Sequence, residues 1–299
     1  MTDAEIEITA ELVRDLLRDQ HPDLAGLPVR EVAGGWGNQM WRLGDDLAVR
    51  VQRMDTTPEP QLKERRWLPE LAPALPLPIP VPVRAGEPSE RFPKHWTVMT
   101  WVHGEPLDLG TITRGTDAAD TLARFLRALH VQAPADAPTS TDRGAHPRDC
   151  TGGFESWLKE ADALNGIAAD VRAVWDDAVT AGEWTGPPMW VHGDLHPANV
   201  VVADGTLAGI VDFGDVFAGD PAWDLIAAWL LLPAGTAARF FDAYARADEA
   251  TIRRARGLAA MKSLFLILMG QNGDRGLPGG KPHWGPLGHA ALERVLKGV

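Results

Sequence analysis

One short stretch of the sequence, WVHGDLHPANVVVADGTLAGIVDFGD from Trp190 to Asp215, limits the folds open to this chain more than any other. Its two apolar runs, VVV and LAGIV, flank Asp204-Gly205, a dipeptide favoured at tight hairpin turns. The runs therefore predict two antiparallel strands joined by that turn. Such a hairpin would bring Asn199, before the first strand, back beside Asp212, after the second.

The polar residues around this hairpin form a set suited to phosphoryl transfer. Side-chain oxygens of Asn199 and Asp212 are ligands that a hard cation such as Mg²⁺ binds, with phosphate oxygens and water completing its shell. Asp194 precedes the hairpin, where its carboxylate could accept the proton of an attacking hydroxyl. Phosphoryl transfer depends mainly on positioning and charge neutralisation, so these three residues would be sufficient. The alternative is an ordinary hairpin with surface carboxylates.

A second alternative concerns the histidines of the same stretch. His192 and His196 stand four residues apart, which would place both on one face of a helix and suit a zinc site. Gly193 and Pro197 oppose a helix there, so zinc is the weaker interpretation.

The chain divides into a part that favours strands and a part that favours helices. Before residue 100 the pattern predicts a helix over 8–20 with Thr9 as N-cap, strands with glycine turns over 29–53, a helix over 58–71, and a strand pair in VPVRAGE and HWTVMTW. After residue 104 it predicts the helices Asp117–His130, Phe154–Leu164, Val171–Ala181, Pro221–Leu231, Ala237–Arg246 and Arg253–Met269. We therefore expect a nucleotide-binding lobe over 1–99, a hinge over 99–104, and a catalytic and acceptor-binding lobe over 100–299.

Near the end of the chain, the segment Asn272–Gly288 is rich in Gly and Pro. This composition predicts a long loop before a final helix, and such loops often bind ligands.

Composition narrows the class of protein further. The chain has 41 acidic and 29 basic residues among 299, a net charge of −12, which argues against a general nucleic-acid binder. Cys150 is its only cysteine, so it can form no internal disulfide, and a reducing compartment fits. The run Leu225–Leu232 is far shorter than the ~20 apolar residues that a bilayer requires. We expect a cytoplasmic protein with no membrane partner.

HGDLHPAN followed by VDFGD resembles the catalytic signature of the aminoglycoside phosphotransferase family. The resemblance implies an α+β, bilobal, protein-kinase-like fold with a small antiparallel-sheet N-terminal lobe and a larger, mainly helical C-terminal lobe. It also implies Mg²⁺, ATP or GTP as co-substrate, and a small-molecule hydroxyl acceptor that could be cationic. The acceptor would be an aminoglycoside-like antibiotic, or alternatively a metabolic alcohol or an amino sugar.

The same resemblance assigns nucleotide-binding roles to residues of the strand-rich part. Gly35 and Gly37 would lie in the loop over the phosphates, and Ala48 over the adenine. Arg50 would take the place of the phosphate-binding lysine and pair with Glu64. Arginine still offers two donors to phosphate, but its contact geometry differs from that of an ammonium group.

Further roles are implied at the hinge and around the catalytic loop. Met99, the Thr100 carbonyl, the Val102 amide and Val211 would contact the nucleotide base. His192 and Asp224 would support the catalytic loop by hydrogen bonds.

Two rival functions remain at this point. A regulatory, pseudokinase-like nucleotide-binding module would have no need of Asp194, Asn199 and Asp212 together. A protein kinase would need a peptide-positioning segment after Asp212, whereas DVFAGDPAWDL runs almost directly into a predicted helix.

Overall fold

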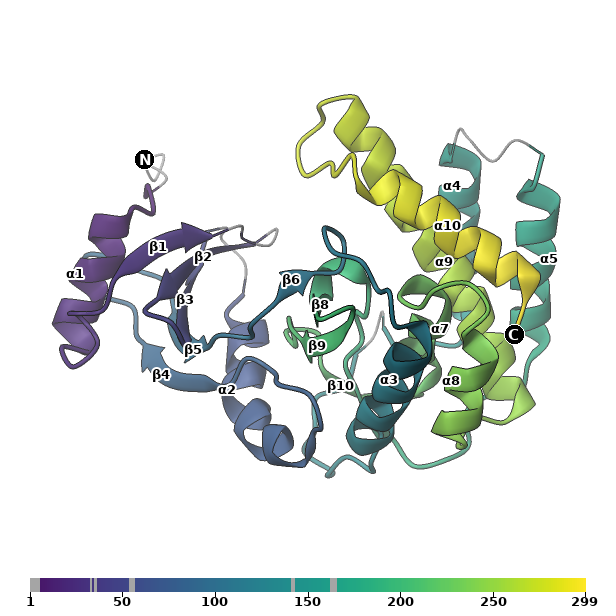
Figure 1. Ribbon diagram of the computed structural model, residues 1–299, viewed down its shortest axis with the longest axis horizontal. Helices are drawn as coiled ribbons and strands as arrows, with labels where there is room; N and C mark the ends of the chain where they lie inside the picture. Colours follow the sequence, from purple (N-terminus) through teal and green to yellow (C-terminus); the bar gives the residue numbers. More distant parts are fainter. Residues whose placement is uncertain (1–5, 33, 35–36, 54–56, 141–142, 162–165) are drawn as a thin grey trace. The chain divides into compact units, whose positions relative to one another are not determined.

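The structure is a computed structural model that describes residues 6–32, 34, 37–53, 57–140, 143–161 and 166–299 (Figure 1). The chain forms two compact units. The first unit comprises Met1–Pro73, Pro78–His103 and Ile210–Gly214. The second comprises Ala74–Leu77, Gly104–Gly209 and Asp215–Val299. Within the described ranges, no helix is long and apolar enough to cross a membrane.

The first unit is built on an antiparallel sheet in the order β1-β2-β3-β5-β4. Its strands are β1 (Val29–Val32), β2 (Asn38–Leu43), β3 (Leu47–Gln52), β4 (Pro82–Gly86) and β5 (Trp96–Thr100). The central strand β3 is buried along nearly its whole length, and its apolar residues are joined there by the buried polar residues Arg50 and Gln52. Helix α2 (Glu59–Leu71) belongs to the same unit.

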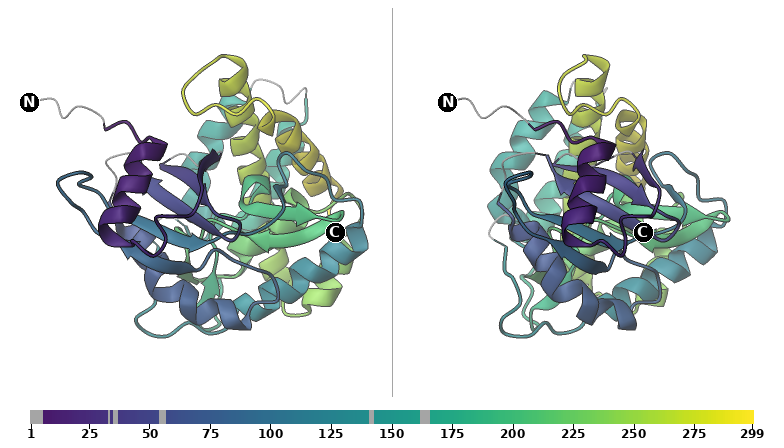
Figure 2. Two further views of the ribbon diagram at one scale, coloured as in Figure 1. Left: turned by 60° about the vertical axis from the view of Figure 1, so that its left-hand side comes forward. Right: turned by 90° about the vertical axis from the view of Figure 1, so that its left-hand side faces the viewer.

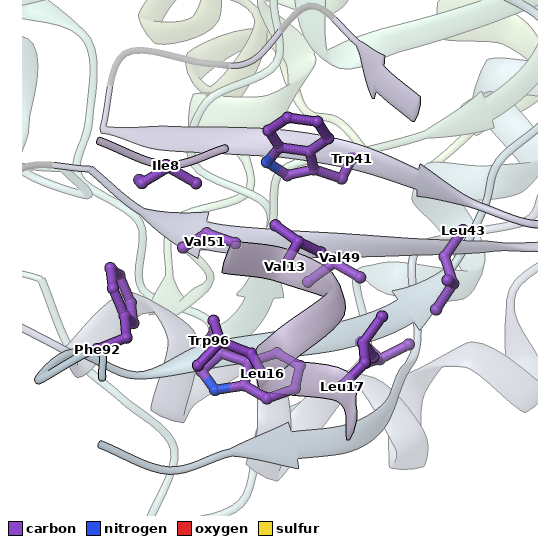
Figure 3. Close-up of a cluster of buried hydrophobic side chains, with 11 residues drawn as sticks. Ile8, Val13, Leu16, Leu17, Trp41, Leu43, Val49, Val51, Phe92 and Trp96 are labelled. Atoms are coloured by element: carbon purple, nitrogen blue, oxygen red, sulfur yellow. The ribbon is translucent and has the colours of Figure 1, made fainter. Parts of the chain in front are cut away.

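Helix α1 (Ala10–Gln20) covers one face of this sheet (Figure 2). As predicted, Thr9 caps it, and the Thr9 hydroxyl accepts from the Leu12 amide at 3.2 Å. Val13, Leu16 and Leu17 recur at helical spacing and pack on the sheet residues (Figure 3). Each leucine buried in this way contributes about 1.5–3 kcal/mol, so the helix is fixed mainly by its apolar stripe.

The second unit is mainly helical. Its helices are α3 (Gly115–Leu129), α4 (Thr151–Glu160), α5 (Ala168–Thr180), α6 (Ala222–Leu225), α7 (Ala227–Leu230), α8 (Ala237–Tyr244), α9 (Glu249–Asp274) and α10 (Trp284–Lys297). Its short strands are β6 (Glu105–Pro106), β7 (Met189–Val191), β8 (Val200–Ala203), β9 (Thr206–Ile210, ending in the first unit) and β10 (Phe217–Gly219). The helix expected over 221–231 is two short helices, and the last residues of the one expected over 154–164 lie outside the described ranges.

The loop predicted for Asn272–Gly288 is largely wrong. Helix α9 continues to Asp274 and α10 begins at Trp284, which leaves a connection of only residues 275–283. The glycines instead permit a close helix crossing: a Cβ on Gly270 would lie 2.4 Å from the Gly285 backbone, and one on Gly288 would lie 2.8 Å from Ile267. Gly270, Gly285 and Gly288 therefore serve close backbone approach, whereas Gly276 and Gly279 in the short connection have positive φ, as turns require.

The central hairpin prediction is confirmed. Strands β8 and β9 are neighbours in a small sheet with β6, and Asp204-Gly205 forms the turn between them. Both turn residues have positive φ, +50° and +73°, as a tight primed turn requires. A Cβ on Gly205 would also lie 2.1 Å from the Thr113 hydroxyl. Both the positive φ and the lack of space for a side chain therefore require glycine at this position.

Candidate functional site

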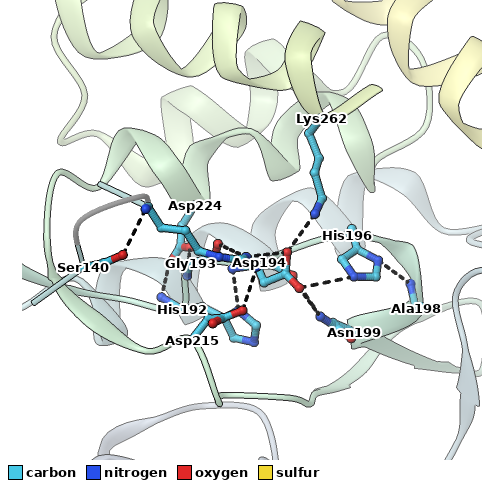
Figure 4. Close-up of polar contacts among 11 residues, drawn as sticks. Ser140, His192, Gly193, Asp194, His196, Ala198, Asn199, Asp215, Asp224 and Lys262 are labelled. Atoms are coloured by element: carbon cyan, nitrogen blue, oxygen red, sulfur yellow. Dashed lines mark hydrogen bonds and ion pairs between the residues drawn. The ribbon is translucent and has the colours of Figure 1, made fainter. Parts of the chain in front are cut away.

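The loop between β7 and β8 is held by one buried carboxylate, that of Asp224 (Figure 4). Its oxygens accept hydrogen bonds from the His192 amide at 2.8 Å and the Gly193 amide at 2.9 Å. The ring of His130 lies 3.1 Å from the same carboxylate through Nε2 and 2.8 Å from the Tyr244 hydroxyl through Nδ1. The His130 ring therefore joins the Asp224 carboxylate to the Tyr244 hydroxyl, and these buried polar atoms satisfy one another.

Asp194 follows this anchored backbone and is contacted by three basic side chains. Lys262 donates to its Oδ1 at 2.8 Å, and Arg143 lies 2.7 Å from the same oxygen. His196 lies 3.5 Å from Oδ2. The side chain of Asp194 is 18% exposed, so it keeps access to a reactant. Figure 4 shows Lys262 reaching this carboxylate from helix α9.

These contacts decide the protonation of Asp194. Burial raises its pKa, but Lys262, the hydrogen bond and charge of His196, and Arg143 together outweigh burial and hold the pKa well below its ordinary value. The carboxylate is therefore ionised near neutral pH. A weakly basic carboxylate suits a loose phosphoryl-transfer transition state, in which the hydroxyl is oriented first and loses its proton late.

Asn199 ends a short 3₁₀ turn directly before β8, and it is 6% exposed. Its amide nitrogen donates to the Asp194 carbonyl at 2.9 Å and lies 3.4 Å from the Asp194 carboxylate. Because the nitrogen is used in this way, the orientation of the side-chain amide is fixed, and its oxygen is the atom left to bind a cation. The donor type fits Mg²⁺.

Asp212 follows β9 and has a backbone φ of +62°, which is unusual for a residue with a side chain. Asp212 is exposed; burial lowers the pKa of Arg50, and the charge of Asp212 opposes that lowering only in part. Strained residues of this kind concentrate at ligand sites. The described residues contain no cluster of three or more His, Cys, Asp or Glu that could hold a metal. A site for Mg²⁺ needs no such cluster, because phosphate and water usually supply most of its ligands.

The structure brings Arg50 and Glu64 together, as the resemblance implied. Both are buried, and the guanidinium pairs with both carboxylate oxygens, with a distance of 3.0 Å between Nη1 and Oε1. The third nitrogen of the Arg50 guanidinium, Nε, is buried, and its N–H has no hydrogen-bond partner among the residues described. A buried unpaired donor costs free energy, so Arg50 offers a hydrogen bond that a bound phosphate could accept.

The other candidate nucleotide residues lie in the same unit as Arg50. Ala48 on β3 pairs in register with Met99 on β5, and both are buried. Thr100 ends β5 and Val102 follows it, while Val211 follows β9. The carbonyl of Gly37 accepts from the Arg53 amide at 2.9 Å, and Gly35 lies outside the described residues. The nucleotide-binding roles of these residues stay predictions.

Sequence reasoning missed two cations beside Asp194. Lys262 has a signal in hindsight, because it is an isolated charge within the apolar sequence AAMKSLF of α9. Arg143 has none: it lies in an irregular segment and also pairs with Asp215 at 2.8 Å and with the Gly193 carbonyl at 2.9 Å.

Comparison with known proteins adds family evidence to this geometry. Residues 28–258 match the family model described as the phosphotransferase enzyme family. No curated protein sequence matches the chain.

Several solved structures share the fold. The chain superposes on the GDP and kanamycin complex of APH(2")-IIia with a TM-score of 0.68 at 19% identity, covering 95% of this chain and 97% of that one. A GDP complex of aminoglycoside 2'-phosphotransferase-IIIa gives a TM-score of 0.66 at 20% identity, covering 97% of this chain and 99% of that one. Macrolide 2'-phosphotransferase MphH from Brachybacterium faecium gives 0.60 at 23% identity, covering 94% and 97%. The expected α+β, kinase-like fold is confirmed.

Proposed function

Because the chain belongs to the phosphotransferase enzyme family, it is a phosphotransferase, and we propose that it transfers the γ-phosphoryl group of ATP or GTP to a hydroxyl of a small molecule. The observation that carries this proposal is the environment of Asp194. Its ionised, partly exposed carboxylate lies on a loop whose backbone amides are held by Asp224, and it lies beside the Asn199 amide. This arrangement suits a group that orients an attacking hydroxyl and then accepts its proton.

The remaining roles follow the sequence. Asn199 and Asp212 would hold Mg²⁺, which when bound neutralises charge on the phosphate oxygens. Arg50 would bind the α and β phosphates through its unpaired Nε–H, with Glu64 fixing the guanidinium. We further propose that residues 1–99 bind the nucleotide, that 99–104 act as the hinge, and that 100–299 carry the base and the acceptor site.

The relatives suggest acceptors without deciding among them. Solved structures with this fold are named as complexes with kanamycin, gentamicin or streptomycin, or as macrolide phosphotransferases. All are below 25% identity to this chain, so aminoglycoside-like, macrolide, amino-sugar and simpler alcohol acceptors all belong in the first screen.

The proposal is tested by incubating the purified chain with Mg²⁺, ATP or GTP, and each acceptor in turn, with products followed by phosphorus NMR. We expect nucleoside diphosphate and a new phosphomonoester signal to form together. Asp212→Asn should raise the Mg²⁺ concentration required, whereas Asp242→Ala, an exposed carboxylate on α8, should not. Nucleotide binding without transfer to any acceptor would contradict the proposal and favour a regulatory binding module.

A further inference from the structure

The helical unit contains a cavity of about 410 Å³. It is lined by Trp157 and Glu160 of α4, by Phe265, Leu268, Met269 and Asn272 of α9, and by Arg275. Most of the wall is aromatic or aliphatic, with polar side chains at Glu160, Asn272 and Arg275. Small-molecule sites commonly combine an apolar wall with a few polar groups in this way.

The side chain of Lys262 connects the cavity to the proposed base, Asp194. Lys262, Phe265, Met269 and Asn272 recur at intervals of three and four residues, which places them on one face of α9. The Lys262 ammonium lies 2.8 Å from the Asp194 carboxylate and 4.5 Å from the centre of the Phe265 ring. An acceptor seated against Phe265 could therefore present a hydroxyl to Asp194.

Aromatic rings continue from the cavity to the catalytic loop. The ring centres of Trp157 and Phe265 are 5.6 Å apart, those of Phe265 and Trp284 are 6.4 Å apart, and those of Trp284 and His196 are 5.0 Å apart. The position of Trp284 is fixed because its indole N–H donates to Asp108 at 2.9 Å. Such a series of rings offers an apolar surface to a ring or chain of the acceptor.

The charges around this surface disfavour an acceptor rich in ammonium groups. Asp194 already contacts three basic side chains, and Asp108 is engaged by Trp284 and His283. Among the described residues that line the cavity, Glu160 is the one carboxylate; it accepts from the Ser156 hydroxyl at 2.7 Å and shares the cavity with Arg275. A polycation would meet the positive charge of Lys262 at close range, and the carboxylates named here, which are those of the described part of this surface, are already engaged.

We propose that the acceptor is an uncharged or anionic alcohol whose apolar ring or chain packs on Phe265 and Trp157, and that Lys262 excludes acceptors with several positive charges. This inference rests on the proposed function, because it assigns the acceptor of the same site. It narrows the acceptor class expected from the sequence, which allowed cationic molecules. Lys262 is here a specificity-determining residue, since it stands between the base and the cavity.

Binding is measured by isothermal titration calorimetry on the full chain without nucleotide. The probes are 4-nitrophenyl glucoside, an uncharged alcohol with an apolar ring, and kanamycin, a polycation. We expect the glucoside to bind the wild type more tightly than kanamycin. Phe265→Ala should weaken glucoside binding by about three- to tenfold, because it removes an aromatic contact. Stronger binding of kanamycin, or no glucoside binding, would overturn the inference.

Lys262 is tested by charge reversal and by neutralisation. Lys262→Glu should shift the binding ratio towards kanamycin by about tenfold or more, which corresponds to about 1.4 kcal/mol for one close charge interaction. Lys262→Met keeps the apolar stem and should give a smaller shift in the same direction. It carries the test if Lys262→Glu disturbs folding. Lys297→Glu, at the exposed end of α10, is the matched control and should leave the ratio unchanged. An unchanged ratio in both Lys262 variants would overturn the inference.

The binding readout separates this inference from the proposed function. If the glucoside pattern holds but no hydroxyl acceptor is ever phosphorylated, the proposed function fails and the cavity assignment stands. If phosphoryl transfer occurs but only to kanamycin-like polycations, the proposed function stands and the acceptor assignment fails.

Discussion

Removal of the Asp224 carboxylate should release the loop that carries Asp194, because this one side chain satisfies two backbone donors. The His192 and Gly193 amides donate to it at 2.8 and 2.9 Å, and all three residues are buried. Each buried donor left without a partner costs about 1–3 kcal/mol. The His130 contact adds to this, so Asp224→Ala should cost about 3–5 kcal/mol in total.

Two measurements on the full chain check this prediction. Urea unfolding gives the change in free energy, with Asp242→Ala on the exposed face of α8 as the matched control. Hydrogen exchange reports the loop directly, because the Gly193 amide loses its acceptor and should exchange faster at temperatures where the fold persists. Once an acceptor is known, the rate of phosphoryl transfer should also fall in Asp224→Ala, since Asp194 follows the released segment.

A loss below about 1 kcal/mol, similar to that of an ordinary surface substitution, would refute the reasoning. It would mean that water or the His192 ring satisfies the two amides when the carboxylate is absent. Unchanged exchange at Gly193 would refute it independently of any change in global stability.

Three further predictions concern folding. Glu64→Ala leaves Arg50 buried without its carboxylate and should destabilise the first unit by about 3–5 kcal/mol in thermal unfolding, whereas Glu70→Ala on the exposed side of α2 should cost little. Asp248→Ala removes the α9 cap and should cost about 1 kcal/mol at pH 7. Hydrogen bonds from Thr251 lower the pKa of Asp248, so this difference should shrink as pH falls through that pKa. Gly205→Val combines positive φ with a clash and should cost about 1–3 kcal/mol in the same assay.

The strand-and-turn part of the fold could be predicted because its signals are local. Thr9 marks the start of α1, and Asp204-Gly205 joins the two strands of the hairpin, since both residues adopt positive φ readily. Patterns of this kind depend only on neighbouring residues.

The glycine-rich end of the chain could not be predicted in the same way. Gly270 and Gly285 are fifteen positions apart in the sequence, and their role is visible only when two helices are seen to touch. Composition alone favours a loop there, because glycine normally lowers helix stability. Tertiary packing overrides that preference.

The candidate site likewise combines residues with a local sequence signal and residues brought in only by tertiary packing. Asp194, Asn199 and Asp212 were proposed from their order within one segment, and the Arg50–Glu64 contact, expected from a resemblance, is present in the structure. The cations beside Asp194 come from distant parts of the chain, Lys262 from 68 positions away. No local pattern could have predicted contacts that only the folded helices create.

The central claim is that Asp194 is the catalytic base, and single-turnover transfer of the γ-phosphoryl group by the Asp194→Ala variant tests it most directly. The account predicts a rate lower by about 10²–10⁴-fold, with nucleotide affinity close to that of the wild type, because the base contributes to the transfer step and not to nucleotide binding. Asp215→Ala, which removes a neighbouring carboxylate paired with Arg143, is the control and should retain most of the rate. Turnover of the Asp194→Ala variant at the wild-type rate would contradict the claim.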